Sequence, residues 1–440
     1  MREALKQAIK RIEELAKTKP IKVISHFDTD GITSAAVTAK ALQRWKKIFS
    51  LKIVKNLDPE TIAALPEDHI LLFTDLASGS LAELAKKPND IFILDHHEIP
   101  EDQEIPKNVT MINPHIQNHD MLSGAGVCYL FAKTISKNNK DLAHLAVIGM
   151  VGDLLEKDIH KTYQEILDDA QVTIKRGLLL YPSTRPLDRT LQYCSNPYIP
   201  GVTGEYKGVI DLLREANIQK ENGKFKSLQD LNDDEMQKLI TAIALKCAGK
   251  SDLSEYIGNL FLVNLFNQLE DAREVSALIN ACSRMGHSEI ALGYCLGSPQ
   301  AKQQAEKIYI DYKQSLVAAL RHAENQENIT GNRYTIIHGR DHIKDTIIGT
   351  VASILSHSPA YEEGTIIIGM AYNEDKIKVS ARLAGKKGRN VREVLHNIVV
   401  PLGGEVGGHP NAAGCMIDKN HEDVFIEQLQ RQLEIEVVKA

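Results

Sequence analysis

Long apolar runs are missing from this sequence. No segment of the 440-residue chain approaches the roughly 20 apolar residues that are needed to cross a bilayer. The N-terminal stretch MREALKQAIKRIEELAK has no apolar signal core and is typical of a charged amphipathic helix. We therefore expect a cytoplasmic protein that does not associate with a membrane.

Paired cysteines and the loops of several enzyme classes are also missing. The six cysteines are scattered with no CxxC pair, which argues against a zinc ribbon or a redox pair and indicates reduced thiols. Without a GxxxxGKS/T loop, nothing supports an ATP-driven enzyme. Without a GxSxG turn, a serine hydrolase of the elbow type has no support either.

Basic charge and aromatic side chains are both scarce. Asp and Glu outnumber Lys and Arg by 58 to 52, which gives a formal net charge of −6. This balance argues against a non-specific nucleic-acid coat, but it allows a nuclease, because metal-binding carboxylates lower the total charge while a local basic groove attracts phosphates. Since aromatic residues make up only 5% of the chain, a bound strand would be held mainly through its phosphates.

Short apolar runs alternate with helical patterns in the first part of the chain. This alternation predicts a mostly parallel sheet that is covered by helices on both faces. A helical pattern such as that of residues 32–45 separates one run from the next. The predicted strands are residues 21–25, 51–54, 70–73, 91–94 and 109–112.

The rest of the chain shows two further sequence patterns, one in the middle and one towards the C-terminus. Residues 159–300 hold amphipathic helical stretches and a Pro-, Tyr- and Gly-rich segment, and residues 302–323 are typical of one long helix. From about residue 332 a second α/β pattern begins and ends in the Gly-rich run PLGGEVGGHPNAAG. We therefore predict an α/β protein with four segments: an N-terminal parallel-sheet catalytic domain (1–165), a mainly helical middle region (166–300), a connecting helix (301–325) and a smaller C-terminal α/β domain (326–440).

Acidic residues and histidines follow four apolar segments in the first part. Sites in parallel α/β sheets form beyond the carboxyl ends of the strands, so these residues could gather in one cluster. Asp and His together suit Mn²⁺, with Mg²⁺ as the alternative. Two such ions lie about 3.5–4 Å apart, share a bridging carboxylate and assist phosphoryl displacement. The residues concerned are His26, Asp28 and Asp30, then Asp75, then Asp95, His96 and His97, and finally Asp153.

Each of these groups has an ordinary explanation when taken alone. Asp75 could be a helix cap or a turn residue, and so could Asp153. The sequence HFDTDG could begin a calcium loop, although the closing Glu of an EF-hand is missing. The combination of all four segments is what favours a two-metal phosphoesterase.

The four segments resemble the successive motifs of the DHH phosphoesterases. The resemblance implies one metal ion held by His26, Asp28 and Asp75, and a second held by Asp30, Asp75, His96 and Asp153. It also implies that His97 faces the substrate phosphate and that Asp95 orients the histidine pair. No ligand of the motifs is missing here.

The C-terminal part resembles the DHH-associated substrate-binding domain. The resemblance rests on residues 348–353 (IGTVAS), on Ser380-Ala381-Arg382 and on residues 407–414 (GGHPNAAG). Gly407 and Gly408 would let backbone N–H groups approach a phosphate, and Arg382 could hold it bidentately. The predicted substrate-binding residues are Ser380, Arg382, Gly407, Gly408, His409 and Asn411. A basic run around them could bind a strand backbone or form a solvated face.

Within the superfamily, the chain is most similar to the archaeal RecJ-like nucleases. Three further stretches carry this likeness: residues 112–115 with 123–129, residues 184–186 with 196–201, and residues 280–286. Arg185 and Arg284 lie in them and could contact substrate or have a structural role. The leading hypothesis is a metal-dependent exonuclease acting on single-stranded DNA or RNA, with replication or repair proteins such as a helicase as partners.

Three alternatives stay open. The chain could hydrolyse short oligonucleotides or cyclic dinucleotides, or it could be a scaffold in a replication complex with residual nuclease activity. A soluble pyrophosphatase would share the ligand motifs, but it should have a much smaller second domain.

Overall fold

The structure is a computed structural model that describes residues 1–99, 104–157, 159–194, 199–247, 256–358 and 360–435. It divides into two compact units, Met1–Tyr309 and Ile310–Ala440. The four predicted segment boundaries stay predictions. In the part of the chain that is described, no helix has both the length and the apolar character that a bilayer crossing requires.

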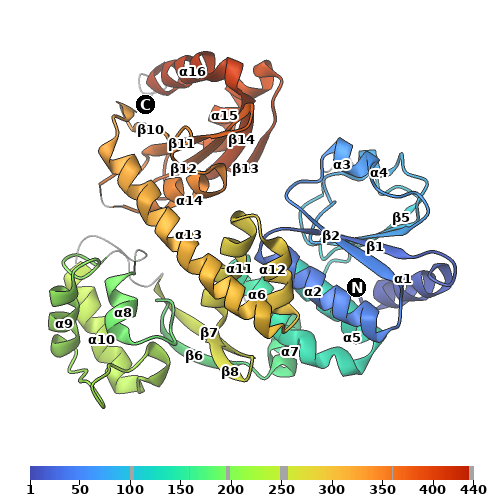
Figure 1. The fold of residues 1–440 in the computed structure, drawn as a ribbon, viewed down its shortest axis with the longest axis horizontal. Helices are drawn as coiled ribbons and strands as arrows, with labels where there is room; N and C mark the ends of the chain where they lie inside the picture. Colours follow the sequence, from blue (N-terminus) through green and yellow to red (C-terminus); the bar gives the residue numbers. More distant parts are fainter. Residues whose placement is uncertain (100–103, 158, 195–198, 248–255, 359, 436–440) are drawn as a thin grey trace. The chain divides into compact units, whose positions relative to one another are not determined.

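The first unit begins with a five-stranded, fully parallel sheet in the order β2-β1-β3-β4-β5 (Figure 1). The predicted strands are confirmed, although some begin or end a few residues away from the predicted bounds. The strands are β1 (Ile21–His26), β2 (Phe49–Val54), β3 (Ile70–Thr74), β4 (Ile91–Leu94) and β5 (Val109–Ile112).

Both faces of this sheet are buried, which explains why its central strands are continuously apolar. Along β3, Leu72 belongs to the core beneath the larger helices, whereas Leu71 and Phe73 belong to a second core on the opposite face. The helices of this part are α1 (Arg2–Leu15), α2 (Thr29–Arg44), α3 (Pro59–Ala63), α4 (Leu81–Leu84), α5 (Gly124–Ile135), α6 (Ala143–Gly152) and α7 (Lys161–Ala170).

The middle region contains a small sheet that the sequence patterns did not predict. It is antiparallel, in the order β6-β7-β8, and the helical segments beside it have a separate apolar core. The resembling residues 196–198 lie outside the described residues. The elements are β6 (Thr173–Leu178), α8 (Leu187–Gln192), α9 (Tyr206–Glu215), α10 (Asp233–Cys247), β7 (Ile257–Leu265), β8 (Gln268–Asp271), α11 (Ala272–Arg284), α12 (Ser288–Cys295) and α13 (Pro299–Asn325).

The second unit has a six-stranded mixed sheet in the order β13-β14-β12-β11-β10-β9. Its core includes Phe425 and Leu429 of the last helix. The Gly-rich run ends in a hairpin at the edge of this sheet, where β13 pairs with β14. The elements are β9 (Ile329–Gly331), β10 (Tyr334–His338), α14 (Asp345–Ser356), β11 (Ile366–Asn373), β12 (Lys376–Leu383), α15 (Val391–Val399), β13 (Val406–His409), β14 (Ala412–Asp418) and α16 (Glu422–Ile435).

Candidate functional site

The acidic residues and histidines of the first unit meet at the carboxyl edge of the parallel sheet. β1, β3 and β4 are neighbours that run in one direction, so the residues that end or follow them are brought together. His26 ends β1, Asp75 directly follows β3, and Asp95 directly follows β4. Asp153 differs from these residues because it follows a helix and not a strand: it is the C-cap of α6.

Two groups of possible metal ligands share Asp75. In the first group, His26 Nδ1 lies 2.9 Å from Asp28 Oδ2 and 3.9 Å from Asp75 Oδ2. In the second, His96 Nε2 lies 3.2 Å from Asp75 Oδ1, 3.1 Å from Asp153 Oδ2 and 3.6 Å from Asp30 Oδ2. The two oxygens of Asp75 therefore face different groups, as a bridging carboxylate must.

The chemistry of these atoms fits divalent cations. Within the described residues, neither carboxylate oxygen of Asp75 has a hydrogen-bond partner, and the same is true of His26 Nδ1 and His96 Nε2. Buried polar atoms are normally paired, so a cluster of unpaired acceptors that converge on one another indicates a missing positive partner. Each group also supplies at least three ligand atoms within 4.8 Å of one another.

Local backbone features hold Asp75 and Asp30 in place. Asp75 has a φ of 59°, a left-handed conformation that turns the chain sharply at the end of β3. Asp30 accepts hydrogen bonds from the backbone nitrogens of Gly124 (2.5 Å) and Ala125 (2.9 Å) at the start of α5. A Cβ atom at Gly124 would lie 2.6 Å from Asp75 Oδ1, so this helix can approach only with glycine there.

Crowding of negative charge shifts the pKa values of the cluster. Burial, together with the Asp153 charge, raises the pKa of Asp30 to about 7. Burial and the charges of Asp30, Asp28 and Asp153 raise the pKa of Asp75 well above its usual value. Burial works to lower the pKa of His96, but the nearby carboxylates of Asp153 and Asp30 outweigh it and raise that pKa to about 9. The cluster therefore retains protons near neutral pH, which bound cations would displace.

Asp95 supports the histidine pair. It is fully buried, and its carboxylate accepts hydrogen bonds from the backbone nitrogen of His96 (2.8 Å), from His97 Nδ1 (2.7 Å) and from the Ser78 hydroxyl (2.6 Å). Burial works to raise the Asp95 pKa, but the hydrogen bond and the charge of His97, with the Ser78 bond, lower it below its ordinary value. Since these donors occupy both oxygens, Asp95 is better suited to orienting His97 than to binding metal.

Ser78 and Asn113 are functional candidates that sequence reasoning did not find. Asn113 donates to the Ser78 hydroxyl (3.2 Å) and to the His97 carbonyl (2.9 Å). It therefore helps to hold both His97 and Ser78, the residue that donates to Asp95. Asn113 lies in a stretch that carried the family resemblance, which was its only sequence signal. Ser78 gave no signal at all.

In the second unit, four of the six predicted substrate residues lie on one face of β12, β14 and β13. Residues directly opposite in paired strands point to the same face. Arg382 pairs with Ala412 and Ala412 with His409, while Ser380 pairs with Gly414 and Gly414 with Gly407. We call this face, defined by Ser380, Arg382, Gly407 and His409, the C-terminal shelf.

Gly408 and Asn411 lie outside this face, and the Arg382 side chain has fixed partners. Gly408 pairs with Ala413 in the neighbouring register and has a φ of 121°, and a Cβ there would lie 2.3 Å from the Ala412 carbonyl. Asn411 lies in the turn of the hairpin. The Arg382 side chain is held by the Ser353 hydroxyl (2.9 Å) and the Ala381 carbonyl (2.8 Å), so its guanidinium is fixed in place.

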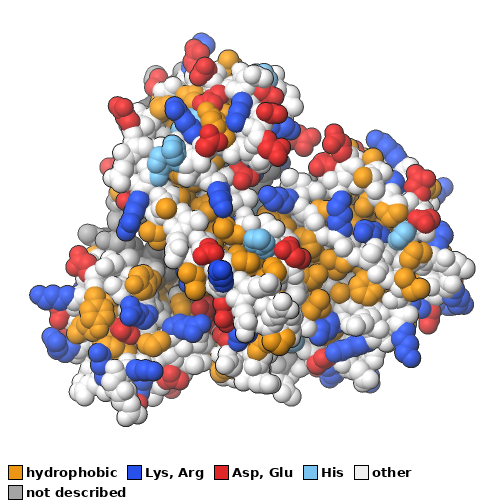
Figure 2. All heavy atoms as spheres, viewed as in Figure 1, with side chains coloured by type: hydrophobic (Ala, Val, Ile, Leu, Met, Phe, Trp, Pro, Cys, Tyr) orange, Lys and Arg blue, Asp and Glu red, His pale blue; other side chains and the backbone are white. Residues whose placement is uncertain are grey.

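Other basic residues have structural partners. Arg185 Nε lies 3.7 Å from a Glu274 oxygen, and Arg389 donates to the Leu433 carbonyl. On the side of each unit that Figure 2 shows, Lys and Arg are interspersed with Asp and Glu. The side shown therefore has no wide basic face among its described residues.

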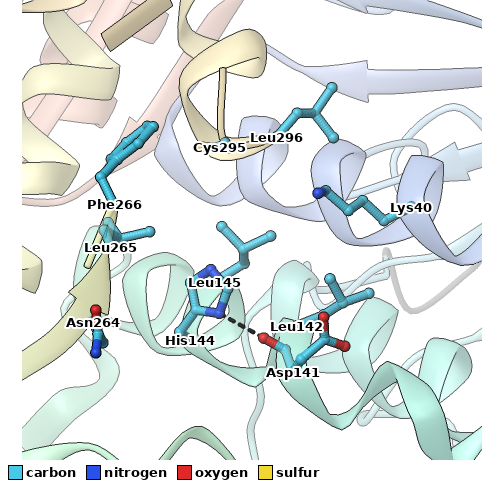
Figure 3. Close-up of a pocket in the computed structure, with 11 residues that line it drawn as sticks. Lys40, Asp141, Leu142, His144, Leu145, Asn264, Leu265, Phe266, Cys295 and Leu296 are labelled. Carbon is cyan, nitrogen blue, oxygen red and sulfur yellow. Dashed lines mark hydrogen bonds between the residues drawn. The ribbon is translucent and has the colours of Figure 1, made fainter. Parts of the chain in front are cut away.

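A cavity of about 200 Å³ lies apart from the acidic cluster (Figure 3). It is lined by Lys40 of α2 and His144 of α6, far along these helices from the ends that carry Asp30 and Asp153. His144 donates to the Asp141 carbonyl (2.7 Å), and burial lowers its pKa. None of the cavity's lining residues belongs to the metal-ligand groups, so it is not part of this site.

Comparison with known families defines the class of protein. Residues 20–150 match the DHH family N-terminal domain, residues 180–260 the DHH-CID domain and residues 332–434 the DHHA1 domain. These three matches together place the chain in the DHH superfamily.

Individual proteins are similar to this chain over nearly all of its length. An uncharacterized protein of Methanocaldococcus jannaschii is 28% identical over 425 residues, which cover 93% of this chain and 92% of the relative. RecJ from Thermus thermophilus, solved with Mn²⁺, has a TM-score of 0.61 at 18% identity, with 98% of this chain matched to 54% of RecJ. CDC45 from Entamoeba histolytica has a TM-score of 0.68 at 12% identity, with 98% of each chain matched. The two solved structures show a shared fold.

Proposed function

We propose that this protein is an exonuclease that hydrolyses phosphodiester bonds of single-stranded DNA or RNA by a two-metal mechanism. The observation that carries the proposal is that the two oxygens of Asp75 face His26 and His96 separately, among unpaired buried acceptors aimed at one another. Bound Mn²⁺ or Mg²⁺ would supply charge neutralisation at the reacting phosphate. Because RecJ from Thermus thermophilus was solved in complex with Mn²⁺, this ion is the first one to test.

The chain's own residues have distinct roles in this proposal. His26, Asp28 and Asp75 hold one ion, and Asp30, Asp75, His96 and Asp153 hold the other. His97, whose side chain is 55% exposed, donates to the substrate phosphate while Asp95 fixes its ring. The C-terminal shelf binds the strand backbone, with Arg382 on a phosphate oxygen, and His409, Gly407, Gly408 and Asn411 complete this contact.

The test uses end-labelled single-stranded DNA and RNA of the same sequence, incubated with Mn²⁺. Asp75→Asn is the informative variant, because asparagine tolerates a positive φ and keeps the side-chain shape while it removes the charge. Asp423→Asn, at an exposed position of α16, is the matched control. We expect stepwise shortening by the wild type and by the control, and loss of turnover in Asp75→Asn.

The alternatives become outcomes of the same assay. If neither strand is cut while short oligonucleotides or cyclic dinucleotides are, the substrate class is wrong but the metal centre stands. If no phosphodiester is cut although metal is bound, a replication scaffold becomes the better explanation. A cytoplasmic location and replication or repair partners are also part of the proposal.

A further inference from the structure

One helix of the middle region reaches the segments that carry three of the proposed metal ligands. α11 packs against α2, whose first turn carries Asp28 and Asp30, and against α6, which leads into Asp153. α11 begins more than a hundred residues after the last of these ligands. The DHH-CID segment, residues 180–260, lies between them in the sequence.

Asn280 of α11 satisfies a backbone donor at the start of α2. The first N–H groups of a helix have no partner within the helix. Asp28 is the N-cap of α2, and its Oδ1 accepts from the Gly31 nitrogen at 3.0 Å. The Thr29 nitrogen instead donates to Asn280 Oδ1, also at 3.0 Å. Asp28 Oδ2 takes no part in this cap and lies 2.9 Å from His26 Nδ1, in the first ligand group.

Thr29 is also the point where three helices meet. Its hydroxyl donates to the Ser276 carbonyl (2.9 Å) and accepts from the Ser276 hydroxyl (3.1 Å). A Cβ atom at Gly152, the last residue of α6, would lie 2.9 Å from Thr29 and 3.5 Å from the Ser276 hydroxyl. The ends of α2 and α6 that carry the ligands are thus packed against one another and against α11.

A buried ion pair fixes the turn that follows Asp153. Arg273, at the start of α11, donates to Glu156 Oε1 at 2.5 Å, and the Glu156 side chain is only 4% exposed. A buried carboxylate needs its partner, so this pair holds residues 155–157 against α11. Asp153 is three residues away from Glu156.

We infer that Asn280 is a positioning residue for the metal centre, acting through Thr29 on Asp28 and Asp30, and that Arg273 does the same for Asp153 through Glu156. Neither side chain is among the proposed metal ligands. This inference deepens the proposed function and rests on its metal centre, but not on which substrate is cut.

The test measures Mn²⁺ affinity by the electron paramagnetic resonance signal of free Mn²⁺ during titration of the full chain. Asn280→Ala removes the acceptor, and we expect Mn²⁺ binding to weaken about 10- to 100-fold, the usual effect of losing a group that orients a ligand. Asn280→Asp keeps an acceptor oxygen at the same place and should recover most of the affinity. Asn264→Ala, at an exposed position of β7, is the control and should bind as the wild type does.

Glu156→Gln tests the second contact, because it keeps the side-chain volume and removes only the charge. We expect weaker binding of the ion held by Asp153. Titrations are made well below the melting temperature of each variant, so that a loss of stability alone does not change the affinity. Wild-type affinity in Asn280→Ala, or no recovery in Asn280→Asp, would overturn the inference for Asn280, and wild-type affinity in Glu156→Gln would overturn it for Arg273.

This readout separates the inference from the proposed function. If the wild type binds two Mn²⁺ ions and cuts no strand, the exonuclease proposal fails while the positioning effect can still be seen in the titration. If strands are cut and Asn280→Ala binds Mn²⁺ normally, the positioning inference fails alone.

Discussion

At the scale of single residues, Asp75 links the two ligand groups. Its oxygens face His26 on one side and His96 on the other, and its left-handed backbone turns the side chain into the cluster. The sequence identified Asp75 from its place after a strand, yet it could not show the positive φ. The positive φ belongs to a backbone conformation that most side chains disfavour and that surrounding contacts impose.

The pKa shifts of Asp30 and His96 predict how the metal-free protein responds to pH. Folded Asp30 keeps its proton up to about pH 7, whereas an unfolded Asp loses it near pH 4. Folded His96 keeps its proton up to about pH 9, against about 6.5 when unfolded. In both windows the folded state binds more protons, so these groups make stability fall as pH rises from about 4 to 9.

Melting temperatures in EDTA between pH 5 and 8 would measure this effect. Asp30→Asn should give a shallower fall than the wild type, because it removes one of the groups. Mn²⁺ should raise the melting temperature more at pH 8 than at pH 6, since fewer protons compete for the ligands. Identical pH slopes for wild type and Asp30→Asn would show that Asp30 titrates normally.

At the scale of elements, the parallel strands and most helices were predictable. Strands such as residues 91–94 are buried on both faces, and such strands are continuous apolar runs that can be recognised in the sequence. The strands β6 and β13 were not predicted. Residues 173–178 mix Lys, Arg and Gly with apolar residues, and Gly407 and Gly408 favour a loop until pairing with β14 makes them a strand.

Contacts between elements that are distant in the sequence could not be predicted either. Asn280 accepts a hydrogen bond from Thr29, which lies 251 positions earlier in the sequence. Ser78 donates to Asp95 only because β3 and β4, which precede these two residues, are neighbours in the sheet. Local patterns report which face of an element is buried, but they do not report which partner covers it. The proposed ligands could be predicted because each follows an apolar segment, whereas the residues that hydrogen-bond to them follow no such rule.

The close approach of α5 to the metal cluster gives a prediction at this scale. Gly124→Ala places a Cβ 2.6 Å from Asp75 Oδ1, so Asp75 or the helix must move. We expect a loss of about 1–3 kcal/mol in unfolding free energy, as for overpacked cores, together with weaker Mn²⁺ binding.

Gly126→Ala on the same helix is the matched control. Its added Cβ would lie no closer than 3.4 Å to any neighbour, which is an ordinary contact. Urea unfolding and Mn²⁺ titration of both variants measure the difference. Equal behaviour of the two variants would mean that α5 does not constrain Asp75.

At the scale of the whole molecule, the proposed function pairs a chain of net negative charge with an anionic substrate. Because aromatic residues are few, phosphate contacts are the main source of strand affinity under this proposal. We therefore expect kcat/KM on single strands to fall steeply, on a logarithmic scale, with rising salt concentration.

Bis(p-nitrophenyl) phosphate provides the control for salt, because a small diester has no strand backbone to bind. Its hydrolysis should change little over the same range of salt concentrations. If strand cleavage were as insensitive to salt as cleavage of the small diester, a strand bound through its phosphates would be the wrong description.

The most direct test of the central claim is the electron paramagnetic resonance spectrum of the protein loaded with Mn²⁺. Two ions that share Asp75 would lie about 3.5–4 Å apart, so we expect two bound ions per chain with the spectrum of a magnetically coupled pair, and loss of that coupling in Asp75→Asn. Two ions with independent spectra, or a coupled pair that persists in Asp75→Asn, would contradict a metal centre bridged by this residue.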